Sequence, residues 1–160
     1  MTRQSCSLHI AAASTIHTAA GYSIPAIRLW TRMVFACRNR TQYRDQCLLD
    51  TGAPLCIFPA FLHQTYDLDW QPLAGHWPAG FTTWAGVPCT IGRMDVWVPI
   101  PDAPFLAGPF SLIAKFAQGA PSSAAGALPI LLGLNFLADY HAEVAFQIRT
   151  PPYDGLISLP

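Results

Sequence analysis

The chain has 160 residues, and its 9 Lys and Arg residues balance its 9 Asp and Glu residues, so the formal net charge is zero. Hydrophobic residues make up 52% and charged residues 11%, which excludes intrinsic disorder, since disorder needs low hydrophobicity and high net charge. Neutrality argues against sequence-tolerant nucleic-acid binding, which depends on an excess of Lys and Arg, and the length fits one domain.

The apolar composition raises the question of a membrane. The longest apolar stretch, residues 124–138, is broken by Gly, Pro and Asn and is shorter than the ~20 residues of a spanning helix, so we expect no membrane span. The N-terminal residues lack the continuous apolar core of a signal peptide. Five cysteines without CxxC spacing favour reduced thiols in a cytoplasmic protein. Secretion or association with a membrane is the alternative location.

Short apolar runs separated by turn residues fill most of the chain. Residues 1–22 are small and polar without a clear period, which predicts a loose N-terminal extension before a domain over residues 23–160. Strands are expected at residues 24–35, 47–49, 55–58, 87–100, 111–116, 130–133, 142–148 and 156–159. Short helices are expected after Pro59 and over residues 134–137. Loops are expected at residues 38–45, 67–83, 99–109 and 118–126. Such a pattern is typical of an all-β barrel or sandwich with little helix.

One motif carries chemistry, the run Leu48-Leu49-Asp50-Thr51-Gly52-Ala53. An acid directly after a buried strand is costly unless it is hydrogen-bonded or functional. Gly52 permits a sharp turn that brings backbone N–H groups near the carboxylate, and the Thr51 hydroxyl can hydrogen-bond within the loop. The motif predicts a carboxylate held rigidly at the floor of a cleft.

A second motif, Ile130-Leu131-Leu132-Gly133-Leu134-Asn135-Phe136-Leu137, follows a Gly-rich middle segment. The two motifs in this order resemble the retropepsin-like aspartic protease family over residues 24–159. The resemblance implies a closed acid-protease-type barrel with one lobe per chain. It also implies an aspartic endopeptidase, a hydrolase that needs no metal and no cofactor.

The resemblance also implies residue roles. Asp50 falls at the catalytic position, within the active-site loop that includes Thr51, Gly52 and Ala53. Gly133, Leu134 and Asn135 fall at the turn that supports this loop from behind. The tip of the hairpin flap that covers a peptide substrate is placed at Trp84, Ala85, Gly86 and Val87.

The mechanism that the resemblance implies needs two carboxylates sharing one proton. The nine acidic residues include one Asp-Thr-Gly only. A second Asp50 must therefore come from a second copy across a two-fold axis, and a homodimer is expected.

Two departures accompany the resemblance. Retroviral enzymes carry an Asp after the Ala and an Arg after the later Gly, where this chain has Pro54 and Leu134. Both partners are missing together, so no unpaired charge is left, and a cellular, bacterial-type relative is indicated. A catalytically silent peptide-binding or interaction module with the same fold is the alternative function.

Other residues have competing interpretations. His63 or His141 beside Cys56 or Ser111 would suggest nucleophilic catalysis, but their spacing does not support it. Trp84 is either packing or an aromatic wall for apolar peptide side chains. Cys47 and Cys56 are expected to be small core residues rather than a redox switch. The basic residues within 38–44 are expected to form a solvated hairpin face rather than a phosphate or RNA site.

Overall fold

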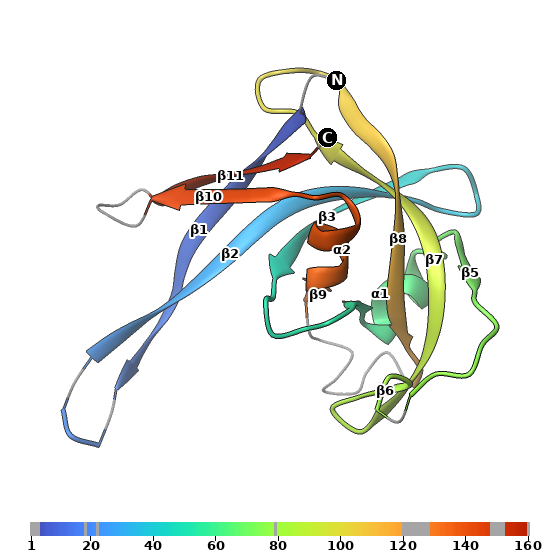
Figure 1. The fold of residues 1–160 in the computed structure, drawn as a ribbon, viewed down its shortest axis with the longest axis horizontal. Helices are drawn as coiled ribbons and strands as arrows, with labels where there is room; N and C mark the ends of the chain where they lie inside the picture. Colours follow the sequence, from blue (N-terminus) through green and yellow to red (C-terminus); the bar gives the residue numbers. More distant parts are fainter. Residues whose placement is uncertain are drawn as a thin grey trace.

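The computed structural model describes residues 4–17, 19–21, 23–78, 80–119, 129–147 and 153–159. Within these ranges the chain forms eleven strands and two short helices (Figure 1). In chain order they are β1 (Gln4–His17), β2 (Ser23–Ala36), β3 (Gln42–Leu49), β4 (Cys56–Phe58), α1 (Ala60–Thr65), β5 (Trp70–Pro72), β6 (Thr83–Trp84), β7 (Val87–Pro99), β8 (Leu106–Ala117), β9 (Ile130–Leu132), α2 (Leu134–Asp139), β10 (Glu143–Gln147) and β11 (Tyr153–Leu159).

Six strands close into a barrel. Strands β2, β3, β9, β4, β8 and β7 pair in that order, and β7 pairs again with β2 at Val34↔Trp97 and Phe35↔Val96. Closing a sheet on itself removes the free edges through which strands of other chains could pair. The predicted fold class, a closed barrel with one or two short helices, is confirmed.

Strand β9 lies between β3 and β4, the two strands that the Asp50 loop connects. It pairs with β3 in parallel, at Leu48↔Leu131, and with β4 in antiparallel fashion, at Ile57↔Leu131. The loop that contains Asp50 links β3 to β4, so it passes across the end of β9. All three residues of β9 are buried, as expected for a short apolar strand flanked on both edges.

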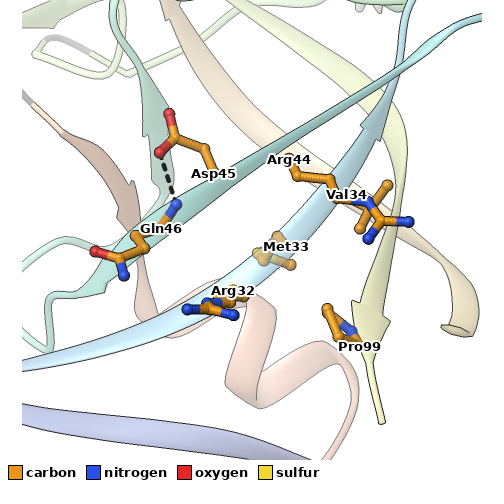
Figure 2. Close-up of a pocket in the computed structure, with 7 residues that line it drawn as sticks. All are labelled: Arg32, Met33, Val34, Arg44, Asp45, Gln46 and Pro99. Atoms are coloured by element: carbon orange, nitrogen blue, oxygen red, sulfur yellow. Dashed lines mark hydrogen bonds between the residues drawn. The ribbon is translucent and has the colours of Figure 1, made fainter. Parts of the chain in front are cut away.

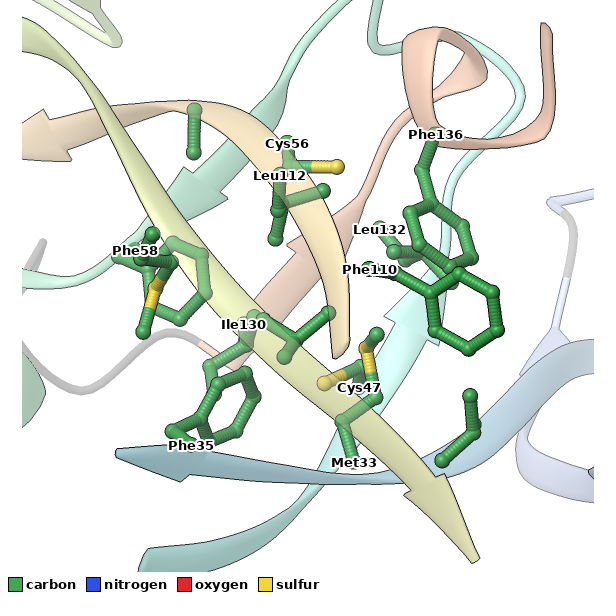
Figure 3. Packing of buried hydrophobic residues seen from close by; sticks show 14 of the residues in the cluster. Met33, Phe35, Cys47, Cys56, Phe58, Phe110, Leu112, Ile130, Leu132 and Phe136 are labelled. Atoms are coloured by element: carbon green, nitrogen blue, oxygen red, sulfur yellow. The ribbon is translucent and has the colours of Figure 1, made fainter. Parts of the chain in front are cut away.

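The core fills the barrel with side chains that alternate along each strand. In β7, Met94, Val96 and Val98 are buried while Asp95 is exposed, the two-residue period of a half-buried strand. Figure 3 shows how the buried side chains of the barrel strands meet those of α2. The labelled residues are Met33, Phe35, Cys47, Cys56, Phe58, Phe110, Leu112, Ile130, Leu132 and Phe136.

Residues 4–17 correct the prediction of a loose extension over residues 1–22. They form β1, which pairs with β2 along one edge and with β11 along the other. The β1–β2 ribbon continues away from the barrel as a long arm (Figure 1). Its Ser- and Ala-rich sequence has little intrinsic β preference, so pairing of its backbone groups on both edges, rather than local propensity, accounts for the strand.

Smaller differences lie in the predicted loops. Strand β3 begins at Gln42 and so takes in part of the hairpin tip expected at residues 38–45. The segment expected to be irregular, residues 67–83, contains β5 and the start of β6. Most of the loop expected at residues 118–126 lies outside the described residues, as does Ile148. Within the part of the chain that the structure describes, no helix has the length and apolarity to cross a bilayer.

Candidate active site

Asp50 lies in a tight turn directly after β3. Its backbone N–H donates to the Leu132 carbonyl at 3.0 Å, which ties the start of the turn to the end of β9. The Gly52 N–H donates to Asp50 Oδ1 at 2.9 Å, and the Ala53 N–H donates to the Asp50 carbonyl at 3.2 Å. The carboxylate is therefore oriented by a backbone donor within its own turn, as the sequence predicted from Gly52.

Behind this turn lies the start of α2. The Leu134 N–H donates to the Ala53 carbonyl at 2.9 Å, and the Asn135 N–H donates to the Pro54 carbonyl at 3.2 Å. Gly133 is required by space rather than by its φ angle of −82°, because a Cβ there would lie 2.5 Å from the Leu55 carbonyl carbon. The two segments predicted to pack together are thus in direct backbone contact.

The side chain of Asn135 joins three elements behind the Asp50 loop. Its Oδ1 accepts a hydrogen bond from the Cys56 N–H of β4 at 2.9 Å, and its Nδ2 donates to the Ile113 carbonyl of β8 at 2.8 Å. A carboxamide supplies both a donor and an acceptor, which explains why Asn suits this position better than an apolar residue would.

Cys56 completes this network. The Gly133 N–H donates to its Sγ at 3.2 Å, and Sγ in turn donates to Asn135 Oδ1 at 3.3 Å. Burial raises the pKa of the Cys56 thiol to about 12, while the Gly133 N–H acts in the opposite direction. The thiol therefore stays protonated and keeps its donor. The sequence correctly placed Cys56 in the core, but its hydrogen-bonding role carries no recognisable sequence signal.

In front of Asp50 the structure opens into a cavity of about 440 Å³. Its walls are mostly apolar, with one cation and one carboxylate, and one wall is the side chain of Trp84 from β6. The lining residues are Arg28, Leu29, Leu48, Leu49, Asp50, Thr51, Trp84, Pro129 and Leu131. The structure thus brings the predicted Asp50 loop and the predicted flap tryptophan to one hollow, together with Leu131 of the second motif. It adds Arg28, Leu29 and Pro129, which the sequence did not indicate.

Trp84 belongs to a tight hairpin. It pairs with Val87 across two residues, Ala85 and Gly86, whose φ angles are +48° and +78°. Positive φ at both central positions is characteristic of the type I′ turn, which matches the twist of the flanking strands. The structure therefore forms a hairpin tip at the four residues where the sequence placed one.

A second hollow, of about 340 Å³, lies between β2, β3 and the end of β7 (Figure 2). Arg32, Arg44 and Pro99 line it. The Asp45 carboxylate there accepts hydrogen bonds from the Tyr43 hydroxyl and the Gln46 N–H, each at 2.7 Å. Among the described residues it shares no lining side chain with the Asp50 cavity.

The competing site residues are not assembled for nucleophilic catalysis. His63 contacts the Ala117 carbonyl through Nε2 at 2.7 Å, whereas Cys56 bonds to Asn135, and His141 is exposed. Among the residues that the structure describes, no three His, Cys, Asp or Glu side chains gather in a way that could hold a metal ion.

Comparisons with known proteins found a structural similarity but no sequence match. No family model matches the chain, and no curated protein matches its sequence. The structure is similar to the crystal structure of a retropepsin-like aspartic protease from Rickettsia conorii, with a TM-score of 0.43 and 12% sequence identity, over 99% of this chain and 96% of that one. At this level of similarity the match assigns no role to any residue of this chain.

Proposed function

We propose that this protein is an aspartic endopeptidase whose active site is formed by Asp50 from each of two identical subunits. The observation that carries the proposal is the placement of Asp50. Its carboxylate accepts a hydrogen bond from the Gly52 N–H at 2.9 Å, its loop is hydrogen-bonded to the Gly133–Asn135 turn behind, and it lines a cavity that Trp84 also lines. A fixed carboxylate at the floor of a partly apolar hollow suits acid–base chemistry on a bound peptide.

Two carboxylates are needed for the reaction. One, ionised, removes a proton from a water molecule as the water oxygen attacks the peptide carbonyl carbon. The other, protonated, gives its proton to the carbonyl oxygen, and the C–N bond then breaks as the leaving nitrogen takes up a proton. Because the chain carries one Asp-Thr-Gly, we infer a homodimer in which a two-fold axis brings two Asp50 side chains together.

The lining of the cavity supports a substrate with apolar side chains. Leu29, Leu48 and Leu131 offer apolar contact surface, and the Trp84 ring adds an aromatic wall. We infer that an extended peptide lies between the Asp50 loop and the Trp84–Val87 hairpin, with its backbone hydrogen-bonded to the chain as an added strand.

The decisive experiment is cleavage of an unfolded protein at about pH 4–6, with wild type and Asp50→Asn compared. We expect the substitution to lower the rate by about three orders of magnitude or more, because it removes the group that carries the proton. Asp102→Asn, the same change at an exposed residue, is the matched control and should cleave like wild type.

Equal cleavage by wild type and Asp50→Asn would overturn the enzyme proposal. Peptide binding by both, without cleavage by either, would favour the silent interaction module instead. The dimer is tested by adding excess Asp50→Asn to wild type. Mixed dimers hold one intact carboxylate, so activity should fall in proportion to their population. A strict monomer by sedimentation, with activity retained, would exclude the shared site.

A further inference from the structure

Lys115 is the chain's single lysine, and its side chain is 7% exposed. Lysine is among the residues least often buried, because its ammonium loses hydration unless it finds partners. The alternation of side chains along β8 explains which way the Lys115 side chain points. Ala114 and Phe116 on either side are fully buried in the barrel, so Lys115 projects from the other face of β8.

The segment that covers Lys115 supplies its partners. Nζ donates to the Gly80 carbonyl at 3.0 Å and to the Thr83 carbonyl at 2.9 Å. It also lies 5.5 Å from the centre of the Phe81 ring, within the range of a cation–π contact. An ammonium has three N–H donors. Two of them go to these carbonyls, and the Phe81 ring adds an electrostatic contact with the charge.

These partners lie at the base of the hairpin. Thr83 and Trp84 are the only residues of β6, so few ladder bonds hold this arm. The Cys89 N–H adds one bond to the Thr82 carbonyl at 2.8 Å, and Trp84 packs against a small cluster that includes Ala60. Lys115 therefore makes two of the charge-assisted hydrogen bonds that fix where this arm lies, and such bonds are about twice as strong as neutral ones.

We propose that Lys115 is a positioning residue that latches the Trp84–Val87 hairpin against the barrel and so sets the height of Trp84 over the Asp50 cavity. The latch rests on the geometry alone, whereas its effect on peptide cleavage rests on the proposed function. Lys115 acts through the Thr83 carbonyl and the Trp84 side chain.

The single lysine allows a direct test that needs no activity. An amine-specific reagent will modify Lys115 in the native chain far more slowly than in the same chain unfolded in urea, because the hairpin base covers Nζ. Trp84→Ala, which removes the packing of this arm, should raise the native labelling rate by about tenfold or more. Native labelling as fast as in urea, or a rate unaffected by Trp84→Ala, would overturn the latch.

A second test separates positioning from general stability. In Lys115→Met, which keeps the length of the side chain, backbone hydrogen exchange at residues 80–87 should rise by about tenfold, because the charge-assisted bonds are lost. Exchange at Cys47–Leu49 should stay unchanged. Lys115→Arg keeps the cation and should restore most of the protection. Unchanged exchange at residues 80–87, or an equal increase at both places, would overturn the proposal.

Cleavage kinetics complete the test. Lys115→Met should raise KM about tenfold while kcat changes by less than about twofold, because a displaced hairpin weakens substrate binding more than it alters the carboxylates. A fall in kcat with KM unchanged would contradict a positioning role. If wild type cleaves nothing, the proposed function fails while labelling and exchange still decide whether Lys115 is a latch.

Discussion

The two sides of the Asp50 cavity are built differently. Its floor is the Asp50 turn, backed by Asn135 and Cys56, and hydrogen bonds link it to β9, β4 and β8. On another side lies the Trp84–Val87 hairpin, called the cover after its proposed role. Its first arm has two residues, and it is held by the ammonium of Lys115 and the packing of Trp84. Hydrogen bonds from several strands hold the floor, whereas fewer contacts hold the cover.

The Asp50 turn is therefore expected to be more rigid than the Trp84–Val87 hairpin. A group that takes part in proton transfer is most effective when its surroundings are already organised before the reaction. Under the proposed function, the hairpin must open to admit a peptide and close on it, and elements that move in this way come from the least stable parts of a fold. Substitutions in the floor should therefore cost folding free energy, and those in the cover should cost little.

The largest effect is expected from Gly133→Ala. The new Cβ would lie 2.5 Å from the Leu55 carbonyl carbon and 2.8 Å from the Ala53 carbonyl oxygen, so the turn behind Asp50 must move. We expect the free energy of unfolding to fall by about 3 kcal/mol, measured by urea denaturation.

Gly86→Ala in the cover is the matched control. A Cβ there meets nothing within 4 Å, so the cost comes from the φ angle of +78° alone and should be about 1 kcal/mol. Equal losses of unfolding free energy in Gly133→Ala and Gly86→Ala would contradict the prediction that the floor tolerates substitution less well than the cover.

A smaller effect is expected from Asn135→Ala. The change leaves the Cys56 N–H and the Ile113 carbonyl without their partners, at a cost of about 2–3 kcal/mol. Gln118→Ala is the control at the cover side. Among the described residues, its side-chain amide donates one hydrogen bond, of 2.8 Å, to the Phe116 carbonyl, so the substitution should cost less than about 1 kcal/mol. If Gln118→Ala lost as much stability as Asn135→Ala, the prediction that floor substitutions cost more than cover substitutions would be wrong.

The smallest effect is a pH dependence that arises near the cover. Burial lowers the pKa of His63 from its ordinary value of 6.5, while its contact with the Ala117 carbonyl acts in the opposite direction. The unfolded chain therefore binds a proton more readily than the folded chain, so stability is full above about pH 6.5 and falls as the pH drops below it.

Thermal unfolding between about pH 8 and pH 5 checks this. His63→Gln, which cannot titrate, should lose less stability over that range than wild type, whereas His141→Gln, a change at an exposed histidine, should behave like wild type. Identical pH profiles for wild type and His63→Gln would assign the acid sensitivity to other groups.

Much of the floor could be predicted from the sequence. Local signals predicted the strand before Asp50 and an apolar strand at residues 130–133, because each is a short apolar run bounded by turn residues. The family resemblance implied that the turn at Gly133–Asn135 supports the Asp50 loop. The many short strands predicted an all-β barrel or sandwich, and the family resemblance implied the closed barrel. The two short helices were expected after Pro59 and over residues 134–137.

The cover and the N-terminal strand depend on distant contacts, which a single sequence shows poorly. One edge of β1 pairs with β11 at the other end of the chain, and local propensity does not reveal this pairing. The positions of Arg28 and Lys115 depend on which loop passes over which strand. One signal was present for Lys115: a lone lysine between Ala114 and Phe116, within an otherwise apolar strand, is a buried polar group that needs a partner.

The place of β9 has a consequence for how the chain folds. Residues 47–49 pair in parallel with residues 130–132, so the intervening half of the 160-residue chain must be looped out before the two strands meet. Such distant pairings slow folding. The N–H of Asp50 gains its acceptor at Leu132 only when this has happened. During synthesis, a chain that has not yet released β9 from the ribosome carries the Asp-Thr-Gly sequence without the support that orients it. We therefore expect the carboxylate site to appear with the last steps of folding rather than the first.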